Sequence, residues 1–232
     1  LLAACADKSL AGFKPDIDGY FLPRSPQAIY QAGAQAHIPL LVGSNSQEGS
    51  YVFLFKQQQP PTPAHYHIVM EQRFGKHAAE ALKLYPGNDE AEVKASGTAL
   101  SGDQFIALAT WRWMHLQQRT GDAPVYYYYF TKARPASRDG VQGPGTGAVH
   151  SGEIEYALGN LAGNHVYAWT DADHKVSATM QGYFANFIKT GNPNGTDLPH
   201  WPQAVPQHDG LPRQVIGTHT HTRLDHDAAR YE

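Results

Sequence analysis

Two strand-like segments separated by a helical block most constrain what this chain can fold into. Residues 38–43 form a compact apolar run closed by a glycine, which is typical of a strand buried on both faces of a parallel sheet. Residues 125–130 are six consecutive β-formers that follow a Gly-Asp-Ala-Pro turn. Between them, residues 60–121 carry apolar side chains at helical spacings of three and four. This order predicts an α/β architecture.

Turn and cap residues set the bounds of the other predicted elements. Ser25-Pro26 predicts a short helix over residues 27–36, because proline is favoured at the first helical position. A helix over residues 171–190 is expected to be capped by Asp171 or Asp173 and stopped at Gly191. The remaining predictions are helices at 65–74, 78–85 and 102–118, an irregular stretch at 199–212 and a terminal strand at 214–223.

Composition excludes several classes of protein. The chain has 232 residues, 41% of them hydrophobic, which argues for a packed core and against disorder. The net charge of −3 carries no electrostatic footprint for nucleic acid, so no nucleic-acid partner is expected. No apolar run approaches the ~20 residues of a transmembrane helix, so no membrane span is expected. Cys5 is the single cysteine, which excludes an intrachain disulfide, and it lacks the basic surroundings of a catalytic thiol.

A glutamate follows the first predicted strand at the place where α/β sheets carry their sites. Glu48 lies in the segment Gly-Ser-Asn-Ser-Gln-Glu-Gly, just past the carboxyl end of the strand. Gly43 and Gly49 are expected to allow a sharp backbone turn, and Asn45 is expected to tolerate unusual dihedrals. Such an acid suits the orientation of an imidazole. On the local pattern alone, a solvated loop glutamate next to a turn glycine is favoured over a catalytic acid.

A histidine occupies the glycine-rich loop after the second predicted strand. His150 is a candidate general base, since an unperturbed imidazole titrates near pH ~6.5. Glu153 is expected to help fix the loop, and Ile154, Tyr156 and Leu158 to bury one side of it. A structural loop histidine is the alternative. No ligand set with metal spacing accompanies His150 and Glu153, so neither a metal nor a cofactor is expected. The pair His219 and His221 fits a solvated strand end.

Four blocks of the chain match, in order, the motifs of one protein family. Residues 13–23 are similar to a P-x-x-D-G-x-x-x-P segment, and residues 38–51 to I-P-L-L-x-G-x-N-x-x-E-G-x-x-F. Residues 147–158 resemble G-x-x-H-x-x-E-I-x-Y-x-F-G, and residues 183–202 resemble the closing block W-x-N-F-A-x-T-G-x-P-N…L-P-x-W-P. These blocks give the chain a resemblance to type-B carboxylesterases, the group that contains liver carboxylesterases and cholinesterases. Gln47, where aspartate is common, and Tyr183-Phe184 depart from the family's patterns.

The resemblance implies a fold and a chemistry. The fold implied is the C-terminal half of an α/β-hydrolase, a mostly parallel sheet flanked by helices, with a large helical insertion between the strands that precede Glu48 and His150. Glu48 falls on the family's triad acid and His150 on its triad base, with Glu153, Asn45 and Gly49 in support. The substrate class implied is a small-molecule ester. No metal or cofactor is implied.

The family's nucleophile motif is absent from residues 1–232. No G-x-S-x-G occurs in the chain. We therefore interpret residues 1–232 as the C-terminal portion of one α/β-hydrolase domain, whose N-terminal portion bears the serine and the oxyanion loop and would be the chain's structural partner. Such a fragment is expected to be inactive alone. The alternative is a non-catalytic esterase-like binding or adhesion module. The compartment is open, with secretion or the periplasm favoured over the cytoplasm.

Overall fold

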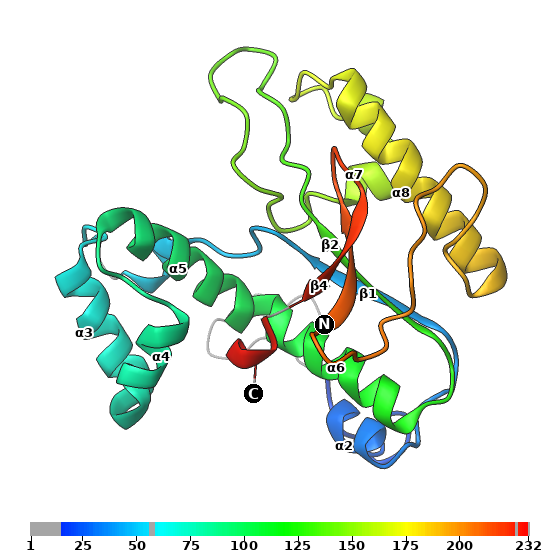
Figure 1. Ribbon diagram of the computed structural model, residues 1–232, viewed down its shortest axis with the longest axis horizontal. Helices are drawn as coiled ribbons and strands as arrows, with labels where there is room; N and C mark the ends of the chain where they lie inside the picture. The colour runs from blue at the N-terminus through cyan, green and yellow to red at the C-terminus, as the bar shows by residue number, and fades with distance from the viewer. Residues whose placement is uncertain (1–14, 56–58, 226, 232) are drawn as a thin grey trace, which may run out of the picture.

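A four-stranded sheet with helices on both faces forms the centre of the computed structural model (Figure 1). The structure describes residues 15–55, 59–225 and 227–231, so Cys5 and the start of the block at 13–23 lie outside the described residues. The strand order is β1-β2-β3-β4; the first three strands are parallel and β4 is antiparallel to β3. The prediction of a mostly parallel sheet is confirmed. The strands are β1 (Leu40–Asn45), β2 (Val125–Phe130), β3 (Leu211–Ile216) and β4 (His221–Asp225).

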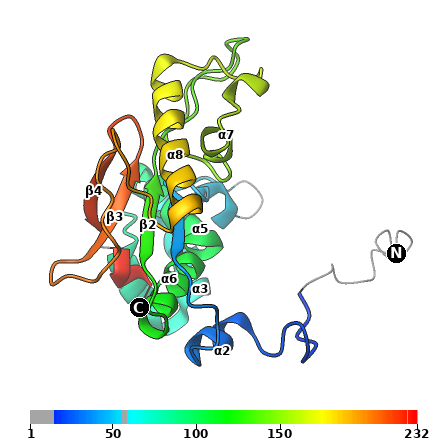
Figure 2. The ribbon, with the colours of Figure 1, turned by 90° about the vertical axis from the view of Figure 1, so that its right-hand side faces the viewer.

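Strand β2 is covered on both faces, which explains its unbroken run of β-formers. Tyr126 and Phe130 pack in a core with α8 (Asp171–Thr190), whereas Val125 and Tyr127 pack in a second core with α6 (Leu108–Thr120). Alternate side chains of a strand point to opposite faces, so an all-apolar strand needs a helix on each side. Figure 2 shows β2, β3 and β4 side by side, with α7 (Ile154–Ala157) next to α8.

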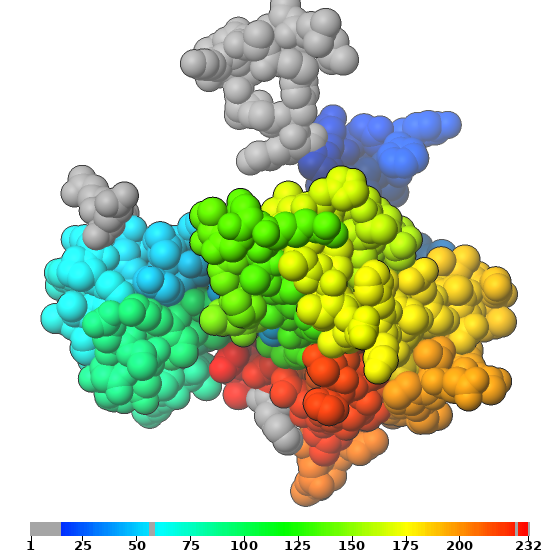
Figure 3. All heavy atoms as spheres, turned by 90° about the horizontal axis from the view of Figure 1, so that it is seen from above, coloured from blue at the N-terminus to red at the C-terminus, as the bar shows by residue number. Residues whose placement is uncertain are grey.

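The helical block between β1 and β2 has a core of its own. Tyr66, Met70, Val93 and Leu100 are buried together there, and Figure 3 shows these helices as a lobe at one end of the molecule. The predicted helical insertion between the two strands is therefore confirmed. Its elements are the 3₁₀ turn Tyr51–Leu54, α3 (Pro63–Phe74), the 3₁₀ turn Gly75–His77, α4 (Ala78–Leu84), α5 (Glu90–Gly102), the π-helix Asp103–Ala107 and α6.

Helix α8 has the predicted bounds but a different cap. Thr170 is the N-cap residue, and its hydroxyl accepts the backbone N–H of Asp173, whose carboxylate accepts the N–H of Thr170 in return. The expectation of Asp171 or Asp173 as the cap was wrong, because Asp173 is the third helical residue of a capping box. Gly191 ends the helix in the left-handed region at φ 75°, as glycine does most readily.

Several other predicted bounds differ from the structure. Helix α2 (Pro26–Gln31) stops early, because the chain turns at Gly33 with φ 64°. The strand predicted at 38–43 is shifted to β1, and the terminal strand predicted at 214–223 is the hairpin β3–β4. Helix α5 was not predicted.

Helix α7 and two 3₁₀ turns, Leu161–Gly163 and Asp227–Arg230, complete the described fold. Tyr156 of α7 is buried, but Ile154 and Leu158 are exposed. The expectation that all three side chains are buried was therefore wrong for two of them. The segment is one short helical turn, so it cannot present an alternating face. None of the helices in the described part of the chain is long and apolar enough to cross a membrane.

Candidate active site

The acid turn directly follows the carboxyl end of β1. Glu48 lies three residues after the last strand residue, and its side chain is only 6% exposed. Its Oε1 accepts the backbone N–H of Asn45 at 2.8 Å. A buried carboxylate requires such partners, because its charge has lost most of its water. The turn thus presents Glu48 with one oxygen already bonded and the other available.

The histidine loop is hydrogen-bonded to the acid turn. The backbone N–H of Gln47 donates to the carbonyl of Ala148 at 2.8 Å, and the N–H of Ala148 donates to Ser46 Oγ at 2.9 Å. These bonds join turns about a hundred residues apart in sequence. They bring His150 Nδ1 to 2.7 Å from Glu48 Oε2.

This pairing fixes the tautomer of the imidazole. A carboxylate only accepts hydrogen bonds, so Nδ1 of His150 carries the proton and Nε2 is the basic nitrogen. The His150 side chain is 50% exposed, whereas its carboxylate partner is buried. The pair can therefore accept a proton at Nε2 from an external group, with the resulting positive charge facing a buried anion.

Asn45 connects the two turns through its side chain, not through an unusual backbone. Its Nδ2 donates to the carbonyl of Val149 at 2.9 Å and to Glu153 Oε2. Asn45 is a strand residue with negative φ, so the expectation that it serves by tolerating unusual dihedrals was wrong. Glu153 does lie against the loop as expected. One buried amide thus holds the start of the acid turn and both ends of the His150 segment.

The two glycines of the acid segment are required by close packing. A Cβ on Gly43 would lie 2.4 Å from the ring of Tyr128 on the neighbouring strand. A Cβ on Gly49 would lie 2.4 Å from the backbone nitrogen of Gly102, at the end of α5. Neither glycine has a positive φ, so the expectation that they allow a sharp backbone turn was wrong. Glycine is needed at both positions because neighbouring atoms leave no room for a Cβ.

Two ionisable groups close to the dyad, Asp103 and Tyr128, were missed by sequence reasoning. Asp103, at the start of the π-helix, is buried and accepts hydrogen bonds from Tyr85 and Tyr231 at 2.8 Å and 3.0 Å. Burial raises the pKa of Asp103, against the opposing effect of these donors and of Arg230. Burial, together with the charges of Glu153 and Glu48, raises the pKa of Tyr128. Only the tyrosine-rich composition hinted at these contacts.

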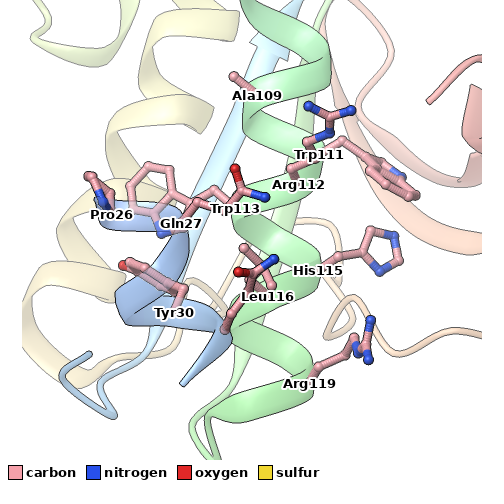
Figure 4. Close-up of a pocket in the computed structure, with 11 residues that line it drawn as sticks. Pro26, Gln27, Tyr30, Ala109, Trp111, Arg112, Trp113, His115, Leu116 and Arg119 are labelled. Carbon is pink, nitrogen blue, oxygen red and sulfur yellow. The ribbon is translucent and has the colours of Figure 1, made fainter. Parts of the chain in front are cut away.

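One cavity adjoins the dyad, and a larger one lies away from it. A cavity of about 60 Å³ adjoins Glu48 and is also lined by Asn45, Asp103 and Arg213. A larger one, of about 910 Å³, runs along α2 and α6 and touches neither Glu48 nor His150. Figure 4 shows Tyr30 and Trp113 next to each other there. Their ring centroids are 6.5 Å apart, and the rings meet edge to face at 84°.

The described residues contain no group of three or more His, Cys, Asp or Glu side chains that could hold a metal ion. His219 and His221 are exposed, and His221 Nδ1 lies 2.9 Å from the backbone oxygen of His219.

Comparisons with known proteins identify the family of this chain. The model of the carboxylesterase family matches residues 3–228. The para-nitrobenzyl esterase of Bacillus subtilis is 30% identical over 197 residues, which cover 82% of this chain and 37% of the relative. The fumonisin B1 esterase of Sphingopyxis macrogoltabida is 30% identical over 207 residues, with 82% and 34% covered, and the human cocaine esterase is 26% identical over 199 residues, with 80% and 35% covered.

A solved structure of PNB esterase superposes on 94% of this chain and 43% of its own, with a TM-score of 0.68 at 25% identity. The chain thus spans little more than a third of the length of the curated relatives it matches. The match of family model and fold over nearly the whole chain leads to one conclusion: this chain belongs to the carboxylesterase family and has the α/β-hydrolase fold.

Proposed function

We propose that this chain supplies the acid and the base of a serine carboxylesterase, with Glu48 as acid and His150 as base. The observation that carries the proposal is the 2.7 Å bond between a buried carboxylate and the Nδ1 of a half-exposed imidazole, at the carboxyl end of a parallel strand. The relatives named above are esterases by name, which supports a small-molecule ester as the substrate.

The serine of this triad lies upstream of residue 1 in our proposal. The chain contains no G-x-S-x-G and spans about a third of its relatives' length. Residues 1–232 then form the C-terminal portion of one domain, and the preceding portion is its structural partner. Backbone N–H groups that hold the oxyanion belong to that portion too, and loss of even one such donor costs about 10²–10³ in rate. The chain alone is therefore inactive.

Each step of the mechanism uses the same nitrogen of His150. Nε2 takes the proton of the serine hydroxyl as the serine oxygen attacks the ester carbonyl. The imidazolium then gives that proton to the leaving alcohol oxygen, and the acyl-serine remains. Nε2 next takes a proton from water as the water oxygen attacks the acyl carbonyl. The imidazolium then returns that proton to the serine oxygen as its bond to the acyl carbon breaks, which releases the acid and restores the serine. In both steps Glu48 holds Nδ1–H and stabilises the imidazolium.

A fluorophosphonate probe tests this function, because it reacts with serines activated by a histidine. We expect the chain joined to its preceding segment to be labelled on a serine of that segment, and the chain alone to remain unlabelled. His150→Ala should abolish labelling of the joined protein. Labelling of a serine within residues 1–232 would contradict the proposed division of the triad. Absence of both labelling and ester hydrolysis in the joined protein would favour a non-catalytic binding module.

A further inference from the structure

A π-helix interrupts the helical block next to the dyad. Residues Asp103–Ala107 form this π-helix between α5 and α6. A π-turn inserts an extra residue, so side chains after it point in directions that a continuous α-helix would not give, and such turns are frequent at functional sites. This insertion sets the direction of the central residue, Phe105.

Side chains from other parts of the chain hold the first turn of the π-helix. Asp103 accepts hydrogen bonds from Tyr85 and Tyr231, and its Oδ2 lies 3.7 Å from Arg230 Nη1. Gln104 accepts a hydrogen bond from Arg73 of α3 at 2.7 Å. The backbone that carries Phe105 is thus tied to α3, to the residue that follows α4 and to residues 230–231.

The ring of Phe105 lies against the imidazole of His150. The two ring centroids are 4.9 Å apart and the planes meet at 68°, an edge-to-face arrangement that aromatic rings prefer. Phe105 is 57% exposed, so burial in a core does not account for its position. Through this contact, the helical block between β1 and β2 touches the loop that carries His150.

The imidazole requires a second constraint. The hydrogen bond from Nδ1 to Glu48 fixes one atom, but small coupled rotations about the Cα–Cβ and Cβ–Cγ bonds can still tilt a half-exposed ring. Rotation moves Nε2, the atom that must meet the serine hydroxyl. A misplacement of about 1 Å can cost about 10²-fold in rate. A ring packed edge-to-face on the imidazole opposes this rotation.

We propose that Phe105 is a positioning residue for His150: held by the anchored π-helix, it fixes the plane of the imidazole so that Nε2 points to the reacting serine. The proposal rests on the proposed function, because it concerns the same base. It assigns to Phe105 an effect on the rate of the chemical step and none on the binding of the ester.

Kinetics of Phe105 variants test the proposal in the chain joined to its preceding segment, with p-nitrophenyl acetate as substrate. We expect Phe105→Ala and Phe105→Leu each to lower kcat about two- to tenfold with KM unchanged. This range is the change in rate that corresponds to the loss of one edge-to-face aromatic contact from the transition state. Phe105→Tyr, which keeps the ring, should restore kcat. Trp113→Ala is the matched control: it removes another edge-to-face pair, with Tyr30, away from the dyad, and should leave kcat unchanged.

A spectroscopic readout separates positioning from a general structural effect. The Nδ1 proton shared with Glu48 gives a low-field proton resonance, which we expect to broaden in Phe105→Ala and to remain sharp in Phe105→Tyr and Trp113→Ala. A raised KM with unchanged kcat would mean that Phe105 only contacts the substrate, and would overturn the proposal. Wild-type kcat in both Phe105→Ala and Phe105→Leu would also overturn it. If His150→Ala retains hydrolysis, the proposed function itself fails.

Discussion

Individual residues of the site act mainly through close approach and shared hydrogen bonds. Glu48 and His150 could be chosen from the sequence because acid and base each follow a strand and match family blocks. The roles of Asn45 and Gly49 could not be derived in this way. Asn45 acts through Val149 and Glu153, about a hundred residues away, and Gly49 acts through the end of α5. A sequence shows which side chain is present but not which distant backbone lies against it.

Gly49→Ala tests this close approach. The added methyl group would lie 2.4 Å from the nitrogen of Gly102 and 2.6 Å from the carbonyl carbon of Ser101, and backbone atoms cannot move as a flexible side chain can. We expect a loss of about 1–3 kcal/mol in the free energy of unfolding, measured by urea denaturation. Gly163→Ala is the control, because nothing lies within 4 Å of the position that its methyl group would take. Equal stability of the two variants would contradict the packing argument.

At the scale of elements, sequence patterns predicted the bounds of a helix or strand correctly where the pattern was strong and uninterrupted. The run at β2 and the long periodic helix α8 were predicted with their observed bounds. Helix α5 was missed because its sequence contains Ser96, Gly97 and Gly102, which are poor helix formers. Those small residues are required where α5 packs on the acid turn and on the segment after it: a Cβ on Gly97 would lie 2.9 Å from Tyr51 Cβ. Tertiary packing therefore overrode propensity there.

The start of α8 should make stability depend on pH. Burial alone would raise the pKa of Asp173, but hydrogen bonds from Lys132, Thr170 and Tyr156 outweigh it and hold that pKa below its usual range. Because the folded pKa lies below the unfolded value of ~3.9, the stabilisation is complete above that value and is lost as the pH falls through the folded pKa. The contribution of Asp173 to the free energy of unfolding should therefore be lost as the pH falls below about pH 4.

Asp173→Asn isolates this contribution. The variant should be less stable than the wild type at neutral pH, and the difference should shrink as the pH falls below the unfolded pKa of ~3.9. Asp171→Asn, which changes an exposed residue of the same turn, should keep the wild-type pH profile. Urea titrations at a series of pH values measure both. A difference between Asp173→Asn and wild type that is constant with pH would contradict the argument.

At the scale of the whole molecule, the fold places an acid and a base together in a chain that holds no nucleophile motif. The four ordered blocks made this arrangement predictable, because they carry the relative position of distant segments, which composition and periodicity do not. The blocks did not predict the contact of Phe105 with His150. They also did not predict the hydrogen bonds and the ion pair that hold the π-helix carrying Phe105. Those contacts join five separate parts of the chain, and none has a local sequence signal.

The most direct test of the central claim is the kcat/KM of ester hydrolysis by the chain joined to its preceding segment, before and after His150→Ala. We expect a loss of at least about 10³-fold, as for the removal of the base from a serine triad. The matched control is His208→Ala, which removes a histidine whose Nδ1 lies 2.6 Å from Asp209 but which is almost fully exposed. His208→Ala should keep the wild-type value. A His150→Ala variant as active as His208→Ala would contradict the assignment of Glu48 and His150 as the catalytic acid and base.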